Sequence, residues 1–199
     1  MELMLATTNS GKIRELTGLL AEAGITAAGL PEDMVIEPPR EDGTTFAENV
    51  AIKAAYYAKR LGMPVLADDS GLEVAALKGE PGVLSARYGG GETTFDEKMR
   101  LILDRLAETE SSDRKARFVC AAALADPNGS VVHLTVGTCD GSIADAPFGT
   151  GGFGYDPIFV PDGFDRTFGE LPSEIKDSLS HRSKAIAEML PFLREFLAV

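Results

Sequence analysis

Two neighbouring aspartates, Asp68 and Asp69, end a short apolar run in the segment PVLADDSGL and are the first residues that point to chemistry. Adjacent carboxylates repel, and aspartate is a poor strand former, so the pair requires either water or a positive partner. At the end of a strand they would occupy the side where open α/β sheets bind ligands. Mg²⁺ suits such a point, because it takes one or two carboxylates together with waters and substrate phosphates. Glu41 or Asp42 could add a further carboxylate. A plain turn explains the neighbouring Asp68 and Asp69 equally well.

The segment ATTNSGK, at positions 6–12, gathers hydroxyl, amide and ammonium donors in a turn between a strand and a helix. Free backbone N–H groups at a helix N-terminus, with a lysine nearby, form a ready anion site. The segment is not a P-loop, because Ala6 replaces the first glycine of that pattern and Ile13 replaces its magnesium-binding hydroxyl. It therefore predicts either an anion-binding turn or an N-cap beside a solvated lysine.

Two helices place cations where helices do not ordinarily carry them. Lys53 falls on the apolar stripe of TFAENVAIKAAYYAKR, where it needs a negative partner unless it reaches the rim. His181, Arg182 and Lys184 stand in the first turn of the last predicted helix, where the helix dipole disfavours each positive charge by roughly 0.3–1 kcal/mol. Lys176 lies just upstream. These cations indicate a docked anion or electron-rich group, or else a water-screened surface.

The segment GTGGFGYDP, at 149–157, combines glycines with two aromatic side chains and a carboxylate. The glycines let the backbone approach a ligand closely. Phe153 and Tyr155 offer faces for stacking, and Asp156 offers an acceptor. A flat base with a polar edge would suit this set, and a tight loop anchored by its aromatic residues is the alternative.

The elements that must position these residues follow from the hydrophobic periodicity. Strands are expected at 2–6, 65–67, 117–125, 131–139 and 158–161, and helices at 13–23, 45–61, 94–108 and from about 180 onward. Loops are expected at 30–43, 81–92 and 146–157, and turns at 126–129 and 140–141. Helix–strand units followed by a β-meander predict one α/β domain over residues 1–199, with a mixed sheet and two lobes.

Composition excludes several classes of protein. The 199-residue chain carries 31 acidic and 19 basic residues, a net charge of −12, which argues against a nucleic-acid partner but not against a small phosphorylated molecule. No run approaches the roughly 20 apolar residues of a membrane span, and the N-terminus does not have the form of a signal peptide. Cys120 and Cys139 fit no metal or disulfide spacing, so we expect a reduced, cytoplasmic protein.

Six segments together resemble one family, the inosine triphosphate pyrophosphatases, which act on non-standard purine nucleoside triphosphates. The segments are ATTNSGK, TFAENVAIKA, ADDSGLEV, PGVLSARY, GTGGFGYDPIF and SHRSKA, in the family's order, over residues 6–185. The resemblance implies a Mg²⁺-dependent hydrolase that converts ITP, dITP and XTP to the monophosphate and pyrophosphate and so cleanses the nucleotide pool. It also implies an elongated two-lobed α/β fold with a central mixed β-sheet flanked by helices, an active-site cleft between the lobes, and a homodimer.

The resemblance assigns roles to individual residues. Asp69 would be the general base and would bind Mg²⁺ together with Glu41 and Asp68, and Lys53 would neutralise charge on the phosphates. Arg182 and its neighbours could donate to the 6-oxo group of the purine. The remaining substrate-binding residues would be Thr7, Thr8, Asn9, Ser10, Gly11, Lys12, Ser70, Phe153, Gly154, Tyr155, Asp156, Lys176 and His181. Thr8 departs from the family pattern, in which glycine is frequent.

Two other functions remain open at this point. The first is a pyrophosphatase for modified pyrimidine or methylated nucleotides with a related two-lobed fold. A haloacid-type phosphatase fits less well, because residues 6–11 lack its D-x-D-x-T/S pattern. The second is a nucleotide sensor that binds without turnover. Three carboxylates near a triphosphate favour an enzyme, since a sensor needs donors rather than metal ligands.

Overall fold

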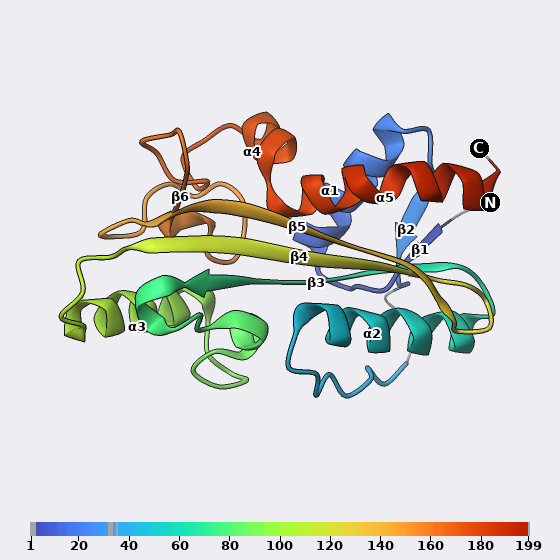
Figure 1. The fold of residues 1–199 in the computed structure, drawn as a ribbon, viewed down its shortest axis with the longest axis horizontal. Coiled ribbons are helices and arrows are strands. Elements are labelled where there is room, and N and C mark those ends of the chain that lie inside the picture. The colour runs from blue at the N-terminus through green and yellow to red at the C-terminus, as the bar shows by residue number, and fades with distance from the viewer. Residues whose placement is uncertain (1–2, 32–33, 35, 199) are drawn as a thin grey trace. The chain divides into compact units, whose positions relative to one another are not determined.

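Short apolar runs form the strands of one mixed sheet in the computed structural model, which describes the whole chain except residues 1–2, 32–33, 35 and 199 (Figure 1). The strands are β1 (Leu3–Leu5), β2 (Ala27–Gly29), β3 (Val65–Val74), β4 (Lys115–Ala125), β5 (Val131–Ile143) and β6 (Phe159–Pro161), in the spatial order β2-β1-β3-β4-β5-β6. Strand β1 runs parallel to β2 and β3, whereas β6 runs antiparallel to β5. The predicted mixed sheet is therefore confirmed.

The helices are α1 (Ser10–Glu22), α2 (Phe46–Leu61), α3 (Phe95–Glu108), α4 (Ser173–Leu179) and α5 (His181–Leu197). All of them except α4 form where the hydrophobic periodicity predicts a helix, although α1 begins at Ser10 rather than at residue 13. Thr45 and Glu48 form a capping box at the start of α2, and Gly62 ends this helix in the left-handed conformation. None of the helices among the described residues has the length and apolar character needed to cross a membrane.

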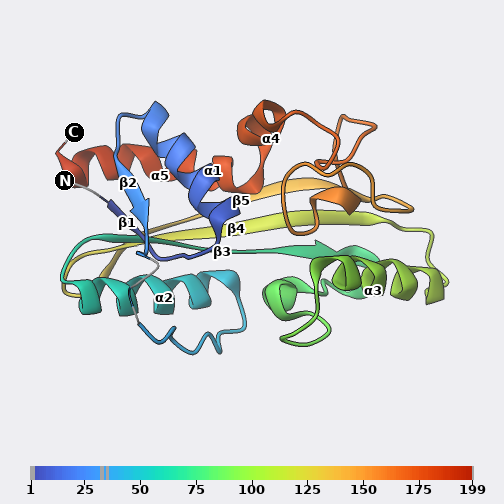
Figure 2. The same cartoon turned by 180° about the vertical axis from the view of Figure 1, so that it is seen from behind.

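The chain divides into two compact units. The first comprises the residues up to Asp69, Cys120–Gly137 and the residues from His181 onward, and the second comprises Ser70–Val119 and Thr138–Ser180. In the first unit, α1 and α5 lie on one face of the strands and α2 lies on the opposite face (Figures 1 and 2). The two lobes and the cleft between them stay predictions.

Each unit has an apolar core of its own. The first core includes Leu3, Leu5, Leu16, Leu20, Leu66, Cys120, Leu124, Ile186, Met189 and Leu193. The second core includes Leu72, Val74, Met99, Ile102, Phe118, Ile158, Phe159 and Phe168. The apolar side chains that α1, α3 and α5 contribute to these cores are thus buried, which fixes the polar side chains on the same elements.

The prediction that the strand ends at Asp68 and Asp69 is wrong. Strand β3 continues to Val74, so the two aspartates lie within the strand. Cations from other parts of the chain meet these carboxylates, as described below, and remove the repulsion that would end a strand here. The predicted turn at 140–141 is also wrong, because β5 continues to Ile143.

Gly141 serves close strand pairing rather than a turn. A Cβ at this position would lie 2.2 Å from the main-chain oxygen of Val160 in β6. The elements β2 and α4 were not predicted, since three and seven residues respectively are too few to display a periodic pattern.

Candidate active site

Asp68 and Asp69 point to opposite faces of the sheet, because successive side chains alternate along a strand. Asp68 faces α1 and α5 and is 1% exposed. Its Oδ2 atom lies 2.9 Å from Nζ of Lys12 and 2.9 Å from Nη2 of Arg182. Burial raises the pKa of Asp68, but Lys12 and Arg182 outweigh it and hold the pKa well below its ordinary value. Asp68 is therefore a buried, ionised anchor.

Arg182 binds two protein carboxylates and is 1% exposed. Its Nη1 donates to Glu15 of α1, while Nε and Nη2 donate to Asp68 of β3. The guanidinium thus joins three elements of the first unit. His181, beside it, is buried as well. The structure places both residues in the first unit, and their expected contact with a purine stays a prediction.

Sequence reasoning missed Glu15. The available signal is its position three residues after Lys12 on α1, which places both side chains on one helix face. Lys12 and Glu15 therefore belong to the same set of charged residues, together with Asp68 and Arg182.

Lys53 meets the negative partners that its position on the apolar stripe predicts. Its Nζ atom lies 3.0 Å from Oε1 of Glu41 and donates to the main-chain oxygen of Asp68 at 3.2 Å. Burial lowers the pKa of Lys53, but Asp68, Glu41 and Asp69 together raise it above its ordinary value. Lys53 is thus a protonated cation among carboxylates.

Asp69 lies on the face of α2 and is 9% exposed. Its Oδ2 atom is buried and has no hydrogen-bond partner within the described part of the chain. Burial raises the pKa of Asp69 above its ordinary value, although Lys53 and Lys12 act in the opposite direction. A carboxylate with a raised pKa is a stronger base, which suits proton abstraction from water.

Glu41 and Asp69 come from separate parts of the chain and both act on Lys53. Among the described residues, no three Asp, Glu, His or Cys side chains are grouped as a metal site, so the expected set with Asp68 is not assembled as such a group. Mg²⁺ needs only one or two carboxylates when waters and phosphates complete its shell. The buried oxygen of Asp69, beside Glu41, fits this requirement. Asp42 is exposed, 3.6 Å from Arg40.

The turn before α1 presents its donors outward. Oδ1 of Asn9 caps the helix by accepting from N of Lys12 at 3.0 Å, and Oγ1 of Thr7 accepts from N of Asn9 at 3.2 Å. Thr8, Asn9 and Ser10 are exposed, whereas Gly11 is buried. A helix N-terminus with exposed donors and a lysine is an anion site in its own right.

Asp156 organises the glycine-rich loop of the second unit. Its buried Oδ2 accepts from N of Phe153 at 2.7 Å and from Nζ of Lys176 at 2.5 Å. Gly152 has a φ of +70°, and a Cβ there would lie 2.0 Å from this oxygen, so only glycine allows the loop to close around Asp156. Nζ of Lys176 lies 4.4 Å from the ring centroid of Phe153 and 5.8 Å from that of Phe168.

Tyr155 differs from Phe153 in its exposure. The ring of Tyr155 is 3% exposed and packs edge-on against Phe95, and its hydroxyl donates to the main-chain oxygen of Ser85 at 2.8 Å. Phe153 is half-buried. Phe95 and Ser85 were not predicted to contact this loop. Ser70, directly after Asp69, is also half-buried.

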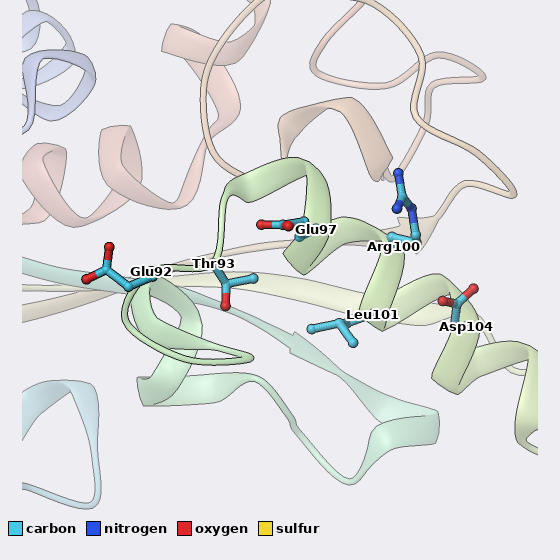
Figure 3. Close-up of a pocket in the computed structure, with 6 residues that line it drawn as sticks. All are labelled: Glu92, Thr93, Glu97, Arg100, Leu101 and Asp104. Atoms are coloured by element: carbon cyan, nitrogen blue, oxygen red, sulfur yellow. The ribbon is translucent and has the colours of Figure 1, made fainter.

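A cavity of about 430 Å³ lies beside α3 in the second unit (Figure 3). It is lined by Glu92, Thr93, Glu97, Arg100, Leu101 and Asp104. The Glu97 carboxylate caps α3 by accepting from N of Thr94 at 2.8 Å. None of the predicted site residues lines this cavity, so it receives no role in the chemistry.

The chain is similar to known proteins over nearly its whole length. A model of the Ham1 family matches residues 3–192. A dITP/XTP pyrophosphatase of Thermus thermophilus is 48% identical over 96% of the chain and 90% of its own length. A dITP/XTP pyrophosphatase of Streptomyces coelicolor is 45% identical over 98% of both chains. The solved structure of a HAM1 protein from Coxiella burnetii superposes with a TM-score of 0.87 at 39% identity, covering 98% of this chain and 99% of the other.

Proposed function

This chain belongs to the Ham1 family, and we propose that it hydrolyses non-standard purine nucleoside triphosphates, namely ITP, dITP and XTP, to the monophosphate and pyrophosphate. The observation that carries the proposal is the gathering of Glu41 and Asp69 around Lys53 in the first unit, with Lys12 also acting on Asp69. Phosphoryl hydrolysis depends mainly on positioning and charge neutralisation, and this set supplies both. Removal of such nucleotides would cleanse the nucleotide pool.

The first unit provides the residues for the phosphates. Donors of the turn from Thr7 to Lys12 bind phosphate oxygens, and the ammonium groups of Lys12 and Lys53 balance their charge. Glu41 and Asp69 would hold Mg²⁺, and the bound ion would act as a Lewis acid on the phosphate oxygens. Asp69 accepts a proton from the attacking water. The water oxygen bonds to the α-phosphorus while the bond to the bridging oxygen breaks and pyrophosphate leaves.

Asp68 has a supporting role in this scheme. Its carboxylate is engaged by Lys12 and Arg182, so it fixes the lysine that faces the phosphates. Arg182, buried between Asp68 and Glu15, braces β3 against α1 and α5.

The second unit provides the chemistry for a purine. The half-buried ring of Phe153 could stack on a flat base, and the buried ammonium of Lys176 could donate to a carbonyl oxygen. Hypoxanthine and xanthine carry an oxygen at position 6, whereas adenine carries an amino group that cannot accept from an ammonium. Tyr155 and Asp156 hold the loop that presents Phe153.

We also propose that the protein is a cytoplasmic homodimer.

A panel of nucleotides tests the proposed reaction. Pyrophosphate release is measured with ITP, XTP, dITP, GTP, ATP and dUTP, each with and without Mg²⁺. We expect rapid, Mg²⁺-dependent release from ITP, dITP and XTP. Preferential release from dUTP would favour a pyrimidine-directed enzyme. Tight ITP binding without release from any nucleotide would replace the proposal with a nucleotide sensor.

A further inference from the structure

The loop that carries Glu41 is fastened to α2 on both sides of this residue. The hydroxyl of Tyr56 donates to the main-chain oxygen of Glu37 at 2.7 Å. N of Gly43 donates to Oδ1 of Asn49 at 2.8 Å. Glu41, between these two points, pairs with Lys53. Tyr56, Asn49 and Lys53 all belong to α2, so a single helix fixes the loop and its carboxylate.

Asn49 is fully buried on the same helix face as Lys53, one turn before it. Because Oδ1 accepts from the N–H of Gly43, the orientation of the amide is fixed and Nδ2 must be the donor. This Nδ2 atom has no hydrogen-bond partner among the residues that the structure describes. A buried amide with an unused donor lowers stability relative to an apolar side chain, so folding alone gives little reason for an asparagine here.

Gly43 shows how closely the loop approaches α2. A Cβ at this position would lie 2.7 Å from Oδ1 of Asn49, 2.7 Å from Cβ of Glu48 and 3.1 Å from N of Asn49. The next residue, Thr44, donates its N–H to the carboxylate of Glu48 at 2.6 Å. The backbone two residues after Glu41 therefore rests directly on the first turn of the helix.

We propose that Asn49 is a positioning residue for the divalent cation. By holding Gly43, its amide oxygen sets the place from which the Glu41 carboxylate reaches the ion beside Asp69 and Lys53. Asn49 acts through Glu41 and does not itself touch the reacting atoms. This inference rests on the proposed function, in which Glu41 is a metal ligand.

Three variants and one control test the inference. Asn49→Ala removes the acceptor, Gly43→Ala disturbs the same contact from the loop side, and Asn49→Asp keeps an acceptor at the same place. Asn128→Ala, in the turn between β4 and β5, is the matched asparagine control. Two measurements are made on each full-length protein: hydrogen exchange of residues 37–43, and Mn²⁺ affinity with no nucleotide present.

We expect Asn49→Ala and Gly43→Ala to speed exchange in the loop about 10-fold or more, while α2 keeps its protection. Mn²⁺ binding should weaken by about 10–100-fold, the usual effect of losing a group that orients a ligand. Asn49→Asp should retain loop protection and Mn²⁺ affinity, and Asn128→Ala should change neither. A purely structural asparagine would instead lower the melting temperature and leave the Mn²⁺ affinity of the folded protein unchanged.

The outcomes separate this inference from the proposed function. A folded Asn49→Ala protein with wild-type loop exchange and wild-type Mn²⁺ affinity overturns the inference. If Asn49→Ala does not fold, Gly43→Ala decides by the same two measurements. A wild-type protein that binds no Mn²⁺ also overturns it, since Glu41 then has no ion to reach. Failure of the wild type to release pyrophosphate would refute the proposed function alone, because neither measurement uses a nucleotide.

Discussion

Replacing Asp68 by asparagine should destabilise the fold, whereas the same replacement of Asp69 should not. Asp68 is a buried partner of both Lys12 and Arg182. Asp69 is buried with an oxygen that no described residue pairs. The two substitutions are chemically identical and lie at adjacent positions of β3, so each serves as the control for the other.

The structure gives the expected size of both effects. Removing one partner of a buried ion pair costs about 3–5 kcal/mol. Arg182 keeps Glu15, and the side chain of Lys12 is 17% exposed to water, so Asp68→Asn belongs at the lower end of that range. A loss of about 3 kcal/mol lowers the melting temperature of a chain of this size by about 6–12 °C. Asp69→Asn removes a poorly solvated charge and should leave stability unchanged or raise it by about 1 kcal/mol.

Urea denaturation and thermal melting of the two variants provide the measurement, and pyrophosphate release from ITP provides the functional readout. Asp69→Asn should fold normally and release no pyrophosphate. Asp68→Asn should unfold at lower urea concentration. Equal destabilisation by both substitutions would refute the division of the pair into a structural and a reactive carboxylate.

Three further predictions concern other charged and aromatic residues. Lys53→Met should lower kcat for ITP by about 10²–10³-fold, because one cation that balances the phosphates is lost; a change of less than 3-fold would remove Lys53 from the mechanism. Phe153→Ala should raise KM for ITP by about 5–150-fold with little change in kcat, the range expected from losing a stacked base; a fall in kcat alone would contradict stacking. The hydroxyl and N–H of Thr44 hold the pKa of Glu48 in the folded protein below its ordinary value. The ionised carboxylate therefore stabilises the fold at any pH above the pKa that Glu48 has in the unfolded chain. This contribution is lost as the pH falls through the pKa that Glu48 has in the folded protein. The urea midpoints of wild type and Glu48→Gln should therefore converge below about pH 4, and a constant difference would show that the charge contributes nothing.

The sequence predicts those features that depend on residues close together in the chain. Thr45 and Gly62 mark the ends of α2. The place of Lys53 on the apolar stripe of this helix predicts that the lysine has a negative partner. The continuation of β3 past Asp69 could not be read locally, because the cations that permit it come from α1 and α5. The partners of a buried charge depend on tertiary packing, which spacing along the chain does not encode.

Tertiary packing also decides what the sequence left open in the candidate site. The two aromatic residues of the glycine-rich loop look equivalent in the sequence, yet Tyr155 is buried against Phe95 while Phe153 is only half-buried. The position of Arg182 against the helix dipole indicated a docked anion or electron-rich group, and the family resemblance implied a role at the purine. Its actual partners, Glu15 and Asp68, are 167 and 114 positions away in the chain.

The pairing of Asp156 with Lys176 has a consequence for selectivity. Because the carboxylate offsets the ammonium charge, this ion pair adds little net charge beside Phe153. Inorganic phosphate and pyrophosphate, which are abundant anions, would gain little electrostatic energy by binding beside this ion pair. If the second unit binds the purine as proposed, a planar, uncharged base would gain dispersion energy and a hydrogen bond there, and the anions that the reaction releases would not accumulate.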